Sequence, residues 1–157
     1  MTELQQILLR LKEQKQYPER LVKLIDIILE SPDGRVDTMA RNKVLEAEGI
    51  RRISDVKEYS LPLVLDFANA CLEDGVITAD ETKAIKLLKA YFGIEDGDFY
   101  KNGWQKEVKA VLFLQLKMVY EDGKVTEQEA LLQSETQGLF GLSYNEWEEI
   151  VKAYFNN

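Results

Sequence analysis

The chain has 157 residues, of which 45% are hydrophobic and 31% are charged. This composition suits one folded domain with its own core and argues against a disordered or low-complexity chain. Histidine is absent, which excludes Ser-His-Asp, Cys-His, HExxH and zinc-finger chemistry. The formal net charge is −8, and residues 61–157 carry all of it, so no nucleic-acid-binding surface is expected.

The N-terminal part predicts three helices. Apolar residues recur at helical spacing within residues 1–17, where Thr2 and Gln5 are placed as a capping box. A second helix is predicted over 19–30, directly after Pro18, and a shorter one over 37–48.

Two segments are apolar on nearly all sides and are predicted to be central. The first runs from Leu61 to Leu72, with Ser60 as its expected N-terminal cap, and the second from Trp104 to Tyr120. More polar amphipathic segments over 78–92, 126–140 and 143–155 would cover them, and the glycine-rich residues 93–103 are expected to form a surface loop.

These patterns predict an all-α fold, a single compact bundle of about seven to eight helices in one domain over residues 1–157. The predicted domain comprises an N-terminal helix within 1–17, repeats near 19–50, 61–94 and 104–142, and a C-terminal helix over 143–155. The one cysteine, Cys71, is expected to be a buried thiol. No apolar run reaches membrane-spanning length, and the N-terminus lacks the pattern of a signal peptide. We therefore expect a cytoplasmic protein without direct membrane insertion.

An internal repeat is the most informative feature of the sequence. The segments starting at Glu73 and Glu121 align without a gap at a spacing of 48 residues. The first set of matched positions is Asp74, Gly75, Ile77, Thr78, Glu81, Phe92, Gly93 and Ile94, and the second is Asp122, Gly123, Val125, Thr126, Glu129, Phe140, Gly141 and Leu142. A weaker copy spans 32–50, with Asp33, Gly34, Gly49 and Ile50 in the same order.

Most repeated residues have a local structural role. Gly75 and Gly123 are placed to end the apolar helices, and Thr78-x-x-Glu81 and its second copy read as capping boxes. Gly93 and Gly141 are placed to end the following helices, each with an apolar residue just after it.

Asp74 and Asp122 have no such structural role, because a carboxylate at a helix C-terminus opposes the helix dipole. An EF-hand is the obvious explanation, with Gly75 at loop position six and Glu81 at position twelve. The first half of the loop contradicts it, because Ala70 and Leu72 stand where oxygen ligands belong.

A different divalent-cation site remains open, built from Asp74, Glu81, Asp122 and Glu129, with calcium, magnesium or zinc as the candidate ion. Carboxylates gathered there would repel one another unless a cation or a basic partner neutralised them. The alternative is that the two turns are apart and solvated.

The repeated motif resembles the TerB-like domains of bacterial tellurite resistance, which are related to the N-terminal domains of DnaJ-like membrane proteins. The likeness rests on an apolar helix, Asp-Gly-x-Ile-Thr-x-x-Glu, an amphipathic helix and Phe-Gly-Ile or Phe-Gly-Leu, and it covers 61–155 best. It implies a helical bundle without catalytic activity, a role in metal-linked stress or protein assembly, and acidic residues that hold divalent cations. Ala40 stands where the third copy would need a glutamate.

Three function classes follow from these observations. The first is a non-enzymatic module for protein interaction or scaffolding, with an unidentified protein partner or a second copy of the chain. Its support includes aromatic residues suited to an interface, although ordinary core packing is the favoured explanation for them: Trp104, Trp147, Tyr154 and Phe155. The second is a cation-binding stress protein, and the third, most distant, is an enzyme with paired carboxylates.

Overall fold

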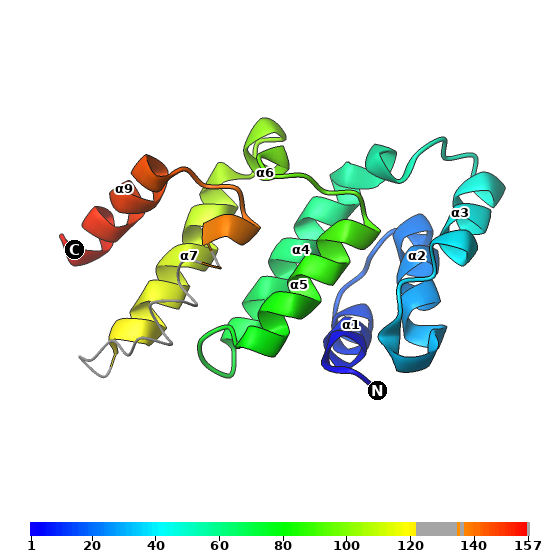
Figure 1. The fold of residues 1–157 in the computed structure, drawn as a ribbon, viewed down its shortest axis with the longest axis horizontal. Coiled ribbons are helices and arrows are strands. Elements are labelled where there is room, and N and C mark those ends of the chain that lie inside the picture. Colours follow the sequence, from blue (N-terminus) through cyan, green and yellow to red (C-terminus); the bar gives the residue numbers. More distant parts are fainter. Residues whose placement is uncertain (122–134, 136, 157) are drawn as a thin grey trace.

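The computed structural model describes residues 1–121, 135 and 137–156, and within them every regular element is a helix (Figure 1). The predicted all-α class is confirmed. The α-helices are α1 (Glu3–Gln14), α2 (Glu19–Glu30), α3 (Thr38–Ala47), α4 (Lys57–Leu72), α5 (Ala79–Tyr91), α6 (Asp98–Lys101), α7 (Gln105–Tyr120) and α9 (Tyr144–Phe155). Two 3₁₀ turns, η1 (Pro32–Gly34) and η2 (Ile53–Val56), flank α3.

The described helices are arranged along the long axis of the molecule (Figure 1). Helices α1, α2 and α3 form one end, α4 and α5 the middle, and α7 and α9 the other end. Helix α1 packs on α2, α4 and α5, while α4 also contacts α7, which in turn contacts α9. None of the described helices combines the length and apolar character that a bilayer crossing requires.

Helix α4 is central, as its composition predicts. Its buried residues lie on all sides of the helix and are Ser60, Leu61, Leu63, Val64, Leu65, Phe67, Ala68, Ala70, Cys71 and Leu72. Burial of Cys71 is thereby confirmed. The aromatic ring of Tyr91 in α5 is also fully buried, and its hydroxyl donates to the Leu24 carbonyl at 2.7 Å, which joins α5 to α2.

The closing glycines of all three repeats end their helices in the same way, which confirms the predicted punctuation. Gly49, Gly93 and Gly141 have φ of 69°, 63° and 67°. After each one the backbone N–H donates to a carbonyl five residues earlier, from Ile50 to Leu45, Ile94 to Lys89 and Leu142 to Gln137. This is the Schellman pattern, which needs a left-handed residue just past the helix.

The first glycine of the motif differs. Gly75 has φ of 132°, which is positive but outside the left-handed helical region predicted for it. Helix α4 ends before it at Leu72, and the Gly75 N–H donates to the Leu72 carbonyl at 3.4 Å.

The expected cap of α4 and the expected loop over residues 93–103 are both wrong. Helix α4 begins at Lys57, so Ser60 is an interior, buried residue and not a cap. The expectation placed Pro62 in the first turn, where proline is tolerated, but the helix continues from η2 and holds Pro62 in its interior. Residues 93–103 are not simply a surface loop, because they form α6, whose Phe99 is 1% exposed and packs against Phe140 with ring centroids 5.2 Å apart.

Helix α7 is buried on one side only, unlike the expectation that it would be covered all round. Val108, Val111, Leu112, Leu116 and Val119 face the core. On the other side Ala110 is exposed, and Phe113 and Leu114 are partly exposed.

Candidate functional site

The structure describes two of the four residues predicted to bind a cation, since Asp122 and Glu129 lie outside the described residues. Asp74 is exposed in the turn between α4 and α5. Glu81 is 7% exposed, in the first turn of α5. In the described part of the chain, no group of three or more Cys, Asp or Glu side chains is placed to hold a metal ion. A cation site at the repeated turns therefore stays a prediction.

Glu81 has the structural role that its motif predicts. Its Oε1 accepts from the Thr78 backbone N–H at 2.9 Å, and its own N–H donates to the Thr78 Oγ1 at 3.1 Å. These reciprocal bonds form the capping box that starts α5. Burial, together with the nearby Glu81 carboxylate, raises the pKa of the Cys71 thiol far above neutral.

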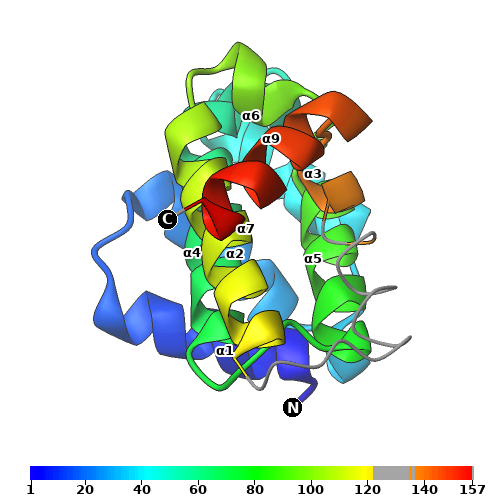
Figure 2. The same cartoon turned by 90° about the vertical axis from the view of Figure 1, so that its left-hand side faces the viewer.

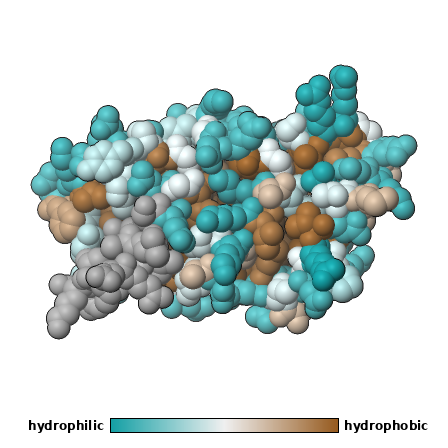
Figure 3. All heavy atoms as spheres, in the orientation of Figure 1, coloured by the Kyte–Doolittle hydropathy of each residue, from teal (hydrophilic) through white to brown (hydrophobic). Residues whose placement is uncertain are grey.

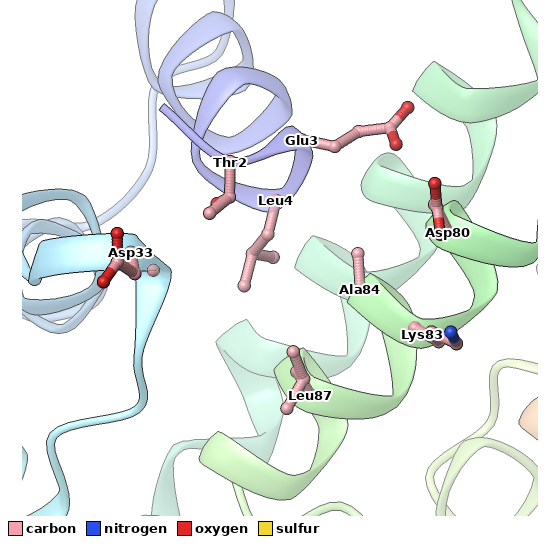
Figure 4. Close-up of a pocket in the computed structure, with 9 residues that line it drawn as sticks. Thr2, Glu3, Leu4, Asp33, Asp80, Lys83, Ala84 and Leu87 are labelled. Carbon is pink, nitrogen blue, oxygen red and sulfur yellow. The ribbon is translucent and has the colours of Figure 1, made fainter.

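A pocket of about 280 Å³ lies beside this cap, between the N-terminus of α1, the turn η1 and helix α5 (Figure 4). Leu4, Ala84 and Leu87 give it an apolar lining. Leu87 is 47% exposed, so part of this apolar lining is open to solvent. On the face drawn in Figure 3, hydrophobic residues gather to the right of the centre, where α1 and α5 lie together.

Carboxylates surround the apolar lining on two sides. Glu3 and Asp80 lie on the same side of the pocket, and Asp33 lies across from them (Figure 4). Lys83 is the one basic residue among those that line it. Partial burial and the charges of Glu81 and Asp80 raise the pKa of Glu3 above its ordinary value. Burial is the larger cause of this shift and the neighbouring carboxylates add to it, so a cation placed among these groups would be favoured.

The pocket wall at α1 is fixed by side-chain bonds. The Gln5 Nε2 donates to the Ile28 carbonyl at 3.0 Å and to the Ser31 carbonyl at 2.8 Å, so α1 is tied to the end of α2 and the start of η1. Thr2 caps α1 by accepting from the Gln5 N–H at 3.2 Å, and the two residues form the predicted capping box. The pocket is therefore largely preformed.

Backbone geometry brings η1 against α1. A Cβ on Gly34 would lie 2.6 Å from the Thr2 Oγ1, so only glycine allows this approach. The residue before it, Asp33, is the one described non-glycine residue with positive φ, at 58°. Such a conformation is costly for most residues and is tolerated best by Asn and Asp.

Sequence reasoning did not identify this pocket, because Glu3, Asp33 and Asp80 come from three separate segments without a shared motif. One signal did exist. Asp33 precedes Gly34 in the weak third copy, in the position that Asp74 and Asp122 occupy in the other two. The aspartate of the Asp-Gly turn thus lies in a pocket in the copy where the cation motif is least complete.

No protein-family model matches this chain, and neither a curated protein nor a solved structure matches it significantly.

Proposed function

We propose that the chain is a non-enzymatic, TerB-like interaction module that receives a lysine or arginine side chain of a partner protein in the pocket of Glu3, Asp33 and Asp80. The observation that carries the proposal is the combination of an apolar lining with carboxylates on two sides. A long basic side chain has the matching pattern, because its aliphatic stem packs on apolar surface while its charged end pairs with carboxylates.

The size and electrostatics of the pocket support a single side chain as its occupant. A volume of about 280 Å³ is small for a drug-sized ligand. The pKa of Glu3 is raised first by burial and then by the charges of Glu81 and Asp80, which an arriving guanidinium or ammonium group would offset. The resemblance to TerB-like domains adds a proposed setting, bacterial tellurite resistance or protein assembly.

A titration with N-acetyl-arginine amide, followed in ¹⁵N-resolved NMR spectra, tests the pocket. We expect the largest shifts at Glu3, Asp33, Asp80 and Leu87. N-acetyl-citrulline amide has nearly the same shape without the charge and should shift these signals little. Glu3→Gln combined with Asp80→Asn should weaken arginine binding about tenfold, because two of the charged partners are removed.

The matched control is Glu46→Gln combined with Asp96→Asn, two exposed carboxylates outside the pocket. It carries the same change in net charge and should leave the pocket shifts unchanged. Shifts spread over the whole acidic surface, or equal weakening by both pairs of substitutions, would show general charge attraction and refute the pocket.

Divalent-cation binding is the second candidate. The charges of Asp80 and Glu81 beside Glu3 favour it, but no three such side chains in the described part of the chain are placed to hold a metal ion. If it operates at the repeated turns, calcium, magnesium or zinc raises the thermal midpoint, and Asp74→Asn with Asp122→Asn removes the increase. An unchanged midpoint with all three ions eliminates it. The same scans are made on Glu3→Gln with Asp80→Asn. Loss of the increase in this variant places the ion in the pocket, and loss in the Asp74 and Asp122 variant places it at the turns.

A further inference from the structure

The outward side of α7 carries a strip of mixed apolar and basic character. Successive residues of an α-helix are 100° apart, so Lys106, Ala110, Phe113, Leu114 and Lys117 share the side opposite the buried residues of α7. The first and last of these lie about 17 Å apart along the axis. We call these five residues, with Lys109 at the edge, the α7 strip.

The α7 strip forms a shallow groove of about 520 Å³, lined by its six members alone. Phe113 and Leu114 are partly exposed and Ala110 is exposed. Beside it, a smaller hollow of about 130 Å³ between α7 and α9 is lined by Lys109, Phe113, Glu149, Ile150 and Ala153. Phe113 lines both surfaces, and its ring packs against that of Tyr154 with the ring centroids 5.3 Å apart.

The view of this end in Figure 2 shows α9 crossing α7, and no other labelled helix lies in front of α7. Soluble helices usually place polar residues on the side away from the core. An apolar row in that position is a surface that a partner could cover.

Charge sets the chemistry of the partner. Lys106, Lys109 and Lys117 surround the apolar residues, and none forms an ion pair with a described residue. Glu107 is the one acidic residue within α7. This positive strip lies on a chain whose formal net charge is −8. Attraction to it therefore depends on the local lysines, and the partner must supply negative charge beside apolar groups.

From this geometry we infer that the α7 strip is the docking site for an acidic amphipathic helix of a partner protein. Such a helix would lay apolar residues at i, i+3, i+4 and i+7 on Ala110, Phe113 and Leu114, with carboxylates beside the lysines. The length of the strip corresponds to three helical turns. The inference concerns a different surface from the pocket and does not rest on the function proposed for it.

Two other occupants fit less well. A second copy of the chain docked through the same strip would bring six lysines together, since a two-fold interface pairs identical surfaces. An anionic membrane would meet only three apolar side chains, of which Phe113 and Leu114 are partly buried, on a molecule of net charge −8. Membrane-binding helices instead present large, protruding apolar faces.

Fluorescence anisotropy with a designed, dye-labelled peptide tests the inference. The probe is an acidic amphipathic helix with leucines at i, i+3, i+4 and i+7 and glutamates on the flanks. One control peptide replaces every glutamate with lysine, and another has the same composition with the leucine spacing scrambled. We expect saturable binding of the first peptide alone, weakened by salt.

Protein variants locate the binding. Lys106→Glu with Lys117→Glu should weaken binding about tenfold or more, and Leu114→Gln should weaken it without altering its salt dependence. The matched control is Lys43→Glu with Lys86→Glu, which reverses two exposed lysines on α3 and α5. Circular dichroism establishes that each variant is folded.

Failure of the probe to bind, or equal weakening by both lysine pairs, would overturn the inference. Binding to vesicles of anionic lipid, lost on reversal of Lys106 and Lys117, with no binding of the peptide, would assign the strip to membranes and also overturn it. If the free protein forms dimers, and reversal of Lys106 and Lys117 abolishes them, the strip is a self-association surface and the inference is likewise overturned.

Discussion

At the scale of single residues, glycines do more in this chain than end helices. Gly141 lies against the backbone of residues 96–97, and a Cβ there would come within 2.5 Å of the Gly97 nitrogen. Gly49 has nearly the same φ, but no atom lies within 4 Å of the position that its Cβ would take. The two glycines therefore separate the cost of the backbone conformation from the cost of a close approach.

Gly49→Ala should cost about 1 kcal/mol of unfolding free energy, because a left-handed residue with a Cβ is strained. Gly141→Ala should cost about 3 kcal/mol, because rigid backbone must also move. Urea denaturation of both variants measures the difference. Equal losses would mean that residues 96–97 do not constrain position 141.

Ser60 is a second informative residue, because its hydroxyl is fully buried in α4 without a hydrogen-bond partner among the described residues. A buried polar group without a partner is destabilising, and alanine is the better helix former. Ser60→Ala should therefore raise the unfolding free energy by about 1 kcal/mol. Thr78→Ala is the contrasting variant, since it removes a cap and should lower stability by a similar amount. A loss of stability in Ser60→Ala would indicate an unseen partner.

The predictability of these residues differs for a physical reason. Thr78, Glu81 and Gly93 were assigned correctly from the sequence because caps depend on neighbours within a few residues. The environment of Ser60 was not predicted correctly, because the start of α4 depends on packing after η2 and not on local capping residues. The pocket of Glu3, Asp33 and Asp80 also required the tertiary structure.

At the scale of elements, the short helix α6 is held by one carboxylate. The Asp98 Oδ2 accepts from the Glu95 N–H at 2.7 Å and pairs with the Lys57 Nζ at 2.9 Å, which links α6 to α4. Burial alone would raise the pKa of Asp98, but these contacts outweigh it and hold the pKa below its ordinary value of 3.8.

Asp98 should make stability depend on pH. Because its pKa is lower in the folded chain than in the unfolded one, its charge contributes stability above the unfolded value of 3.8, and this contribution is lost as the pH falls through the folded pKa. Asp98→Asn should cost about 2 kcal/mol at pH 7. The difference from wild type should shrink as the pH falls below about 4, because protonation of Asp98 removes the contribution of its charge.

Urea denaturation at several pH values measures this effect. Asp96→Asn is the control, since its side chain is 81% exposed and its pair with Lys89 spans 3.6 Å; exposed pairs contribute little. A constant difference between Asp98→Asn and wild type at all pH values would contradict the role of its charge.

The prediction of elements was most accurate for long periodic helices and least accurate for α6. Helices α2, α5 and α9 begin within one residue of the predicted positions, because amphipathic periodicity and caps agree there. Residues 93–103 read as a loop because glycine and acidic residues dominate. Burial of Phe99 against Phe140 supplies the stabilisation that local propensity lacks.

At the scale of the whole molecule, two surfaces of opposite local charge lie at different places along the row of helices (Figure 1). The acidic pocket is beside α1 and α5, and the basic α7 strip is at the end formed by α7 and α9. The net charge of −8 agrees with an acidic surface but gives no indication of the basic one. The net charge is a sum over the whole chain. One side of a helix, in contrast, brings together residues three and four positions apart, so its local charge can have the opposite sign.

Cys71 carries the only thiol of the chain, which makes it a natural probe of transient opening of the structure. The side chain is 2% exposed in α4, so a thiol-reactive dye reaches it only when the helices packed around α4 move apart. Labelling of the native chain should be about a thousandfold slower than labelling in urea. The labelling rate then measures how often the helices around α4 open. If a ligand in the acidic pocket or on the α7 strip slows the labelling, the opening motion extends to that surface.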